Sequence, residues 1–123
     1  MLSKIDFQND HVTAYKWDGK FDEKAFYQSL SEFLPEMKRR DKFNIYMELH
    51  SIDGVEPKAV WQDLKFGLEN MKEITEKVDK VALVTDKNWV QKLAEISYTF
   101  VPGIELKSFA FEKSPEAKKW VVD

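Results

Sequence analysis

Residues able to carry out acid–base or nucleophilic chemistry follow two predicted strands of this chain. They comprise a histidine, two hydroxyls, two carboxylates and a lysine: His50, Ser51, Asp53, Thr85, Asp86 and Lys87. Such groups suffice for catalysis when they converge, and ligands of open α/β sheets bind outside the carboxyl ends of parallel strands. Their spacing does not establish convergence. A structural interpretation is simpler, with Asp86 as a helix N-cap and His50, Ser51 and Asp53 as loop and turn residues.

Several other classes of chemistry are excluded by what the chain lacks. Its glycines are scattered, at Gly19, Gly54, Gly67 and Gly103, so no glycine-rich loop can cradle a phosphate group. The chain has two histidines and no cysteine, which leaves no thiol nucleophile and too few ligands for a typical zinc site. We therefore expect no catalytic residue, no metal and no cofactor, and a protein that is not an enzyme.

Composition points to one small domain. The 123 residues are enough to bury a core without disulfides, so we expect a single domain over residues 1–123. The 19 basic and 22 acidic side chains are interspersed, with a net charge of -3, which disfavours nucleic acid as a partner. No signal peptide or transmembrane stretch is evident, so we expect a cytoplasmic protein.

The first half of the chain predicts a hairpin, a helix and a strand. Strands at 2–7 and 11–17 flank a polar turn. Asp22 is suited to cap a helix, with Phe21 packing on Phe26 as a hydrophobic staple, and Pro35 should kink or restart that helix. Residues 43–49 alternate strictly between apolar and polar, which predicts a strand buried mainly on one side.

The second half alternates helices and strands. A long helix is expected from Pro57 to Met71, followed by a strand at 81–84 covered on both faces. Asp86 begins a helix that ends before Pro102 and Gly103. The last strand begins at Ile104 and changes phase, which predicts an end or a bulge near Ser108, and a short helix follows from Ser114. The order indicates an α/β fold with a mixed sheet of about five strands and about four helices.

Two blocks of sequence carry a resemblance to a known family. One is WQDLKFG at 61–67, and the other is VALVTDKNW at 81–89 with the closing Ala117 and Trp120. In these blocks the chain resembles the SpoIIAA-like branch of the STAS-related proteins, a group that includes anti-sigma factor antagonists. The resemblance implies a compact STAS-like α/β domain that works by binding other proteins.

One feature of the anti-sigma factor antagonists is missing. In them, a serine at the start of the helix after the third strand is phosphorylated to break the complex. The matching region, 53–58, contains neither serine nor threonine, and Ser51 lies several residues too early. We therefore expect a domain without the phospho-serine switch.

Aromatic side chains supply the candidate binding surface. If Val12 and Ala14 face the first helix, Tyr15 and Trp17 share the opposite face with Tyr46, and Phe109 or Phe111 could join them. Such rings would line a partner surface or an amphiphile pocket, unless another helix of the domain covers them.

Three functions remain open from the sequence. The leading one is a non-enzymatic interaction domain that binds a protein partner or a second copy of itself. The alternative is a carrier or sensor of a small apolar, lipid-like ligand, which predicts a closed cavity lined by large aromatic side chains: Trp61, Phe66, Trp89 and Phe100. The third is an enzyme at the strand ends, for which His50 and Asp86 would be required.

Overall fold

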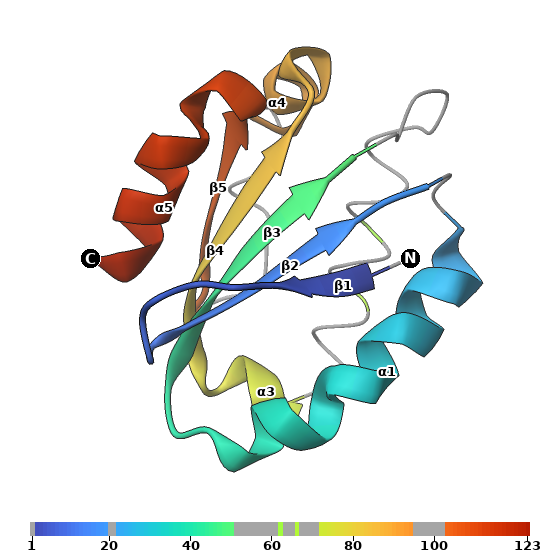
Figure 1. The fold of residues 1–123 in the computed structure, drawn as a ribbon, viewed down its shortest axis with the longest axis vertical. Helices are drawn as coiled ribbons and strands as arrows, with labels where there is room; N and C mark the ends of the chain where they lie inside the picture. Colours follow the sequence, from blue (N-terminus) through green and yellow to red (C-terminus); the bar gives the residue numbers. More distant parts are fainter. Residues whose placement is uncertain (1, 20–21, 51–61, 63–65, 67–71, 95–102) are drawn as a thin grey trace.

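Five strands form one mixed sheet in the order β1-β2-β3-β4-β5 (Figure 1). The computed structural model describes residues 2–19, 22–50, 62, 66, 72–94 and 103–123. The strands are β1 (Leu2–Ile5), β2 (Val12–Trp17), β3 (Phe43–Leu49), β4 (Val78–Thr85) and β5 (Glu105–Ala110). The helices are α1 (Glu23–Arg39), α3 (Lys72–Thr75), α4 (Lys87–Ala94) and α5 (Ser114–Val122), the last preceded by the 3-10 turn η2 (Phe111–Lys113).

The predicted mixed α/β sheet is confirmed. The hairpin pairs β1 antiparallel to β2, from Leu2 opposite Trp17 to Ile5 opposite Ala14. The remaining neighbours β2, β3, β4 and β5 are parallel, as expected for strands joined by helical crossovers. The predicted helix from Pro57 to Met71 lies outside the described residues, apart from Gln62 and Phe66, which are helical.

Helix α1 begins as its sequence predicts. The Asp22 carboxylate accepts hydrogen bonds from the backbone N–H groups of Lys24 and Ala25, which satisfies two donors that a helix start leaves free. Pro35 does not restart the helix, contrary to our expectation, because α1 is one element through Arg39. Its ring is exposed, so it crowds no neighbouring element. The staple residue Phe21 lies outside the described residues.

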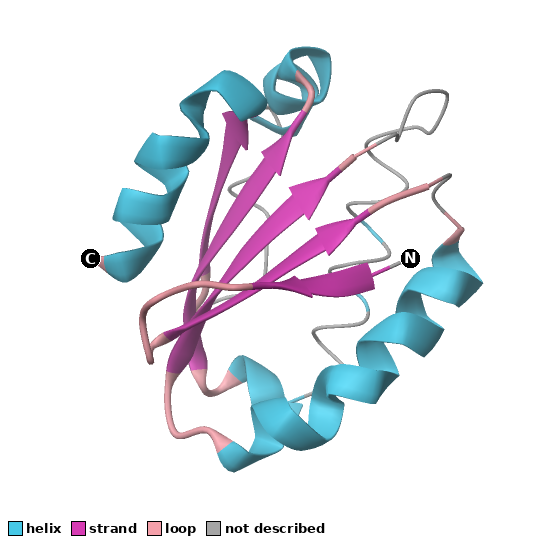
Figure 2. Ribbon diagram, in the orientation of Figure 1, coloured by secondary structure: helices cyan, strands magenta, loops and turns pink. Residues whose placement is uncertain are grey.

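Helices cover the sheet on both faces (Figure 2). On one face, α1, α3 and α4 contribute Phe26, Ile74 and Trp89 to the larger apolar cluster. On the other face, α5 packs on β3, β4 and β5 through Ala117 and Val121. Two-sided cover explains why the whole 81–84 run of β4 is buried, as predicted for a central strand.

The predicted faces of β2 were assigned the wrong way round. Tyr15 and Trp17 pack under α1, whereas Val12 and Ala14 join the cluster beneath α5. Tyr46 also belongs to the α5 cluster, so it does not share a face with Tyr15. Both faces of β2 are apolar, and period-2 alternation separates two faces without saying which helix packs on which.

Strand β5 is regular, so the predicted bulge near Ser108 is wrong. Its register with β4 runs without a shift from Lys80 opposite Glu105 to Thr85 opposite Ala110. The apolar phase changes because Leu106 packs with the α1 cluster and Phe109 with the α5 cluster. A strand covered at different points on its two faces shows such a phase change without any bulge.

The irregularity of the sheet lies in β4, beside Asn44. The β3–β4 register shifts between Phe43 and Ile45, and Val78 and Val81 both face the α1 cluster although they are three positions apart. The Asn44 side-chain oxygen accepts from the Lys80 backbone N–H at 2.9 Å.

The same amide group of Asn44 also holds α5. Its Nδ2 donates to the carbonyl of Val121 at 2.8 Å, in the last turn, where helix carbonyls lack a partner within the helix. The Asn44 side chain therefore pairs with a backbone N–H of the irregular strand and also holds α5 against the sheet.

We predict that Asn44→Ala lowers the free energy of unfolding by about 1–3 kcal/mol. The substitution leaves the Lys80 N–H and the Val121 carbonyl without their hydrogen-bond partner. Urea denaturation measures the loss, and hydrogen exchange should show faster exchange at the Lys80 amide. Asn88→Ala, on exposed α4 surface, is the matched control and should change stability by less than about 0.5 kcal/mol. Equal losses in the two variants would contradict the role of Asn44.

Candidate functional site at the carboxyl end of β3

Three polar side chains line up along the α5 face of β3 toward its carboxyl end. Tyr46, Glu48 and His50 alternate in sequence, so the pleat places all three on the same face. The Tyr46 hydroxyl lies 2.7 Å from Glu48 Oε2, and His50 Nε2 lies 2.8 Å from Glu48 Oε1. Because a carboxylate accepts hydrogen bonds and cannot donate them, the tyrosine and His50 Nε2 are the donors.

This row runs from the core to the surface. Tyr46 is fully buried, whereas the side chains of Glu48 and His50 are 18% and 35% exposed. The His50 ring packs on Phe111, with centroids 4.7 Å apart. A carboxylate and an aromatic ring therefore fix the orientation of a half-exposed imidazole at the carboxyl rim of the sheet.

The ring of Tyr46 has neighbours from two other parts of the chain. Phe7, from the β1–β2 connection, lies with its ring centroid 5.8 Å from that of Tyr46. The ammonium group of Lys118, from α5, lies 5.8 Å from the Tyr46 centroid. Burial, followed by the hydrogen bond to Glu48, raises the pKa of Tyr46 above its usual value, while the hydroxyl of Ser114 acts in the opposite direction.

The other predicted strand-end residues do not complete a catalytic arrangement in the described part of the chain. Thr85 is buried, and its hydroxyl donates to the carbonyl of Leu49 at 3.4 Å. Asp86 directly precedes α4, and its carbonyl accepts from the N–H of Val90, as expected at a helix start. Lys87 forms an ion pair with Glu112 at 3.7 Å. Ser51 and Asp53 lie outside the described residues.

The predicted exposed aromatic surface is wrong. Tyr15, Trp17 and Tyr46 are 0%, 1% and 0% exposed, because the helices of the protein cover both faces of the sheet. Tyr15 packs on Phe33 of α1 at 4.9 Å, and Trp17 packs on Phe26 of α1 at 5.6 Å. These rings form the core, so they cannot contact a partner in this structure.

The residues predicted to line a closed apolar cavity do not share one environment. Trp89 is 6% exposed and belongs to the core cluster on the α1 face. Phe66 is 68% exposed, so its assignment to a closed cavity is wrong. Trp61 and Phe100 lie outside the described residues. The predicted role of these side chains in ligand binding remains a prediction.

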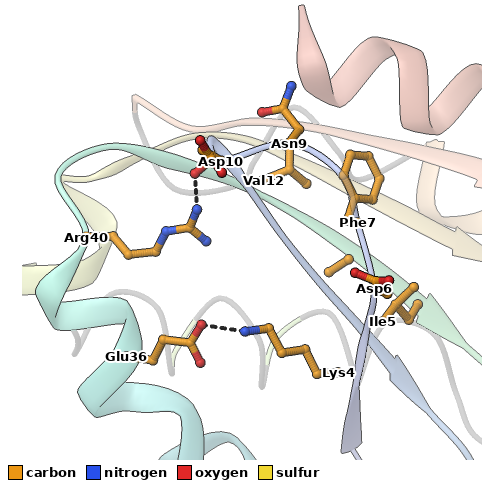
Figure 3. A pocket seen from close by; sticks show the side chains of 10 residues that line it. Lys4, Ile5, Asp6, Phe7, Asn9, Asp10, Val12, Glu36 and Arg40 are labelled. Atoms are coloured by element: carbon orange, nitrogen blue, oxygen red, sulfur yellow. Dashed lines mark hydrogen bonds and ion pairs between the residues drawn. The ribbon is translucent and has the colours of Figure 1, made fainter.

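A polar pocket of about 230 Å³ opens between the β1–β2 connection and the end of α1 (Figure 3). Two of its charged side chains form an ion pair, and a third is hydrogen-bonded to uncharged groups. Lys4 Nζ lies 2.5 Å from Glu36 Oε1, and Arg40 donates to the carbonyl of Asp10 and the hydroxyl of Thr13. The hydrogen bond from Lys4 is the main cause that lowers the pKa of Glu36. Both cations of the pocket are therefore hydrogen-bonded to groups of the protein, and the carboxylates of Asp6 and Asp10 also line it.

Sequence reasoning found His50 and Tyr46 but missed the group that joins them. The alternation of 43–49 places Glu48 on the polar face of a strand, without indicating that it bonds both Tyr46 and His50. The signal was present, because a tyrosine, a glutamate and a histidine at positions i, i+2 and i+4 of a strand must share a face. The contact with Phe111 depends on tertiary structure and has no local signal.

Two kinds of site are absent from the part of the chain that the structure describes. No three histidine, cysteine, aspartate or glutamate side chains gather there in a way that could hold a metal ion. None of the helices described is both long enough and apolar enough to cross a membrane.

A SpoIIAA-like family model matches residues 12–122, which span β2 to α5 and include the whole Tyr46–Glu48–His50 row. The chain belongs to the SpoIIAA-like family. The match confirms the resemblance carried by the sequence blocks at 61–67 and 81–89. No curated protein matches the chain.

A solved structure supports the SpoIIAA-like fold. It is the crystal structure of an uncharacterized protein of the DUF3478 family, with a SpoIIAA-like fold, from Shewanella loihica PV-4. The two chains are 24% identical, the alignment covers 98% of this chain and 92% of the other, and the TM-score is 0.63. At that identity the likeness establishes the shared fold.

We predict opposite effects for two tyrosine-to-phenylalanine variants of this SpoIIAA-like protein. Tyr46→Phe removes the donor to Glu48 and should lower the free energy of unfolding by about 1–2 kcal/mol. Tyr15→Phe removes a buried hydroxyl that has no hydrogen-bond partner among the described residues, so stability should stay unchanged or rise by up to about 1 kcal/mol. Urea denaturation of both variants measures this, and a similar loss in each would refute the distinction.

We also predict that alkaline pH destabilises the fold. Burial is the first cause that raises the pKa of both Tyr15 and Tyr46 in the folded state. A pKa raised by folding contributes stability below the unfolded tyrosine value of about 10, and that stability is lost as pH rises further. Unfolding free energies measured from about pH 8 to pH 11 should fall less steeply in Tyr15→Phe than in the wild type. Parallel pH profiles would show that Tyr15 does not contribute.

Proposed function

We propose that this SpoIIAA-like protein is a non-enzymatic interaction domain that binds a protein partner at the carboxyl rim of its sheet. Family membership supports the general role, because SpoIIAA-like domains usually interact with proteins. The observation that carries the proposal is His50, whose half-exposed ring is held between Glu48 and Phe111. A fixed, amphipathic side chain at a surface costs little conformational entropy to bind, which suits recognition.

The polar row gives the rim a specific chemistry. Glu48 occupies His50 Nε2, which leaves the other ring nitrogen for a partner group. Phe111 adds apolar surface beside the imidazole. The next residue, Glu112, forms an ion pair with Lys87. Aromatic surface flanked by charged groups is the usual composition of a protein-binding patch.

Regulation in this proposal does not use a serine at the start of the helix after β3. The region 53–58 contains no hydroxyl side chain that a kinase could modify. Binding would therefore be controlled by partner concentration or by another part of the surface. The partner is a second copy of this chain or a different protein, and the experiment below separates these outcomes.

We predict that His50→Ala reduces capture of the partner about tenfold, because it removes the side chain at the centre of the rim. The tagged protein, expressed in its source cells at native level, is cross-linked, captured and quantified by mass spectrometry. His11→Ala is the matched control, since His11 is exposed on the β1–β2 connection, away from the carboxyl rim, and should capture as the wild type does.

Native and denaturing mass spectra of the same sample test the alternative functions. A homodimer mass would identify a second copy as the partner. A small-molecule mass released on denaturation would favour the carrier of an apolar ligand and contradict the proposal. Equal capture of one protein by wild type, His50→Ala and His11→Ala would move its binding site away from the rim.

A further inference from the structure

The two edges of the sheet differ in a way that suggests a second binding surface. Strand β1 is short, with four residues, and its Lys4 is paired with Glu36 of α1. Strand β5 has six residues, contains no proline and keeps a regular register with β4. Proteins commonly protect edge strands with bulges, prolines, short length or charged side chains, and of these β5 has only the charged side chains of Glu105 and Lys107. Among the described strands, β5 pairs with β4 alone, which makes it an edge strand of the sheet.

Two lysines and a tryptophan line this edge on the α5 face. The ammonium group of Lys80 lies 5.0 Å from the Trp120 ring centroid and 3.3 Å from the Trp120 carbonyl oxygen. The ammonium group of Lys107 lies 6.0 Å from the same ring and 5.3 Å from the ring of Phe109. We call Lys80, Lys107 and Trp120 the basic edge. The Asn44 bond to the Lys80 N–H anchors the strand at this point.

The charges of the basic edge are not neutralised locally. Within the described residues, neither ammonium group lies within ion-pair distance of a carboxylate. Glu105 stands opposite Lys80 in the strand register and so shares this face, which leaves two cations beside one carboxylate, and Lys80 is directed to Trp120. The protein as a whole carries a net charge of -3, so this cluster runs against the overall charge. A cluster of positive side chains of this kind attracts a negatively charged partner.

We propose that β5 binds an extended acidic segment of a protein partner as an added strand, with its carboxylates at Lys80 and Lys107. The backbone edge would supply hydrogen bonds, and the basic edge would supply selectivity for acidic side chains. A second copy of this chain would bring one Glu105 with every Lys107, so it supplies less negative charge to the basic edge than an acidic segment does. This inference rests on the proposed role in protein binding and adds a site to it.

A pair of synthetic peptides tests the inference with the full chain. The probe is a capped hexapeptide that alternates valine and glutamate, and its control replaces each glutamate by glutamine. Amide chemical shifts in nuclear magnetic resonance spectra report where and how tightly each binds. We expect shifts along β5 with the glutamate peptide and binding about tenfold weaker with the glutamine peptide.

Charge-reversal variants sharpen the test. Lys107→Glu should weaken the glutamate peptide about tenfold and should bind a valine–lysine peptide instead, because Lys107 is exposed and its reversal leaves the core intact. Lys24→Glu is the matched control, since it makes the same charge change on exposed α1 surface and should bind as the wild type does. Recovery of binding by the lysine peptide would separate recognition from loss of folding.

Three results would overturn the inference: no shifts on β5 at saturating peptide, equal binding of the glutamine peptide, or equal weakening by Lys24→Glu. Vesicles containing phosphatidylserine that bind wild type and not Lys107→Glu, while the peptide binds neither, would also overturn it in favour of a lipid surface. His50→Ala should retain peptide binding. If the peptide does not bind at β5 while partner capture still depends on His50, the β5 site is refuted and the proposed function is not.

Discussion

The arrangement of both helical layers depends on how Asn44 accommodates the extra residue in β4. Its side chain accepts from the Lys80 N–H and donates to the Val121 carbonyl, so it joins the irregular strand to the last turn of α5. Without the bulge, Val78 and Val81 could not both face the α1 cluster. The same displacement directs Lys80 to the α5 side, where it meets Trp120. The side-chain amide of Asn44 therefore connects the irregular part of β4 to helix α5.

The packing of α5 on the sheet determines which side chains of β3 are buried and which reach the surface. The helix buries Tyr46 from one face, and the η2 turn before it brings Phe111 against His50. At the buried end of the polar row, the Tyr46 hydroxyl donates its hydrogen bond to Glu48. The exposed end is a fixed imidazole at the rim. The polar row thus joins a closed core to a preorganised rim.

Membership of the SpoIIAA-like family accounts for the fold, while the local features of this chain set its own character. The region 53–58 contains no hydroxyl side chain. The rim at His50 and the basic edge at β5 lie at different places on the sheet, the first at the carboxyl end of a central strand and the second along an outer strand. Two separate surfaces allow a small domain to contact one partner twice, which raises affinity through effective concentration.

Local patterns in the sequence determined the elements and their order. The Asp22 cap, the strand at 43–49 and the apolar run at 81–84 depend on neighbours along the chain, and all three are confirmed. The expected one-sided burial of 43–49 is wrong, because α5 covers the second face and Tyr46 there is fully buried. Only the tertiary structure decided which face of β2 lies under α1, that β5 is regular, and that Tyr15, Trp17 and Tyr46 are core. The reason is physical: alternation separates two faces of a strand equally well whichever face a helix later covers, and burial of an aromatic ring is a property of that packing.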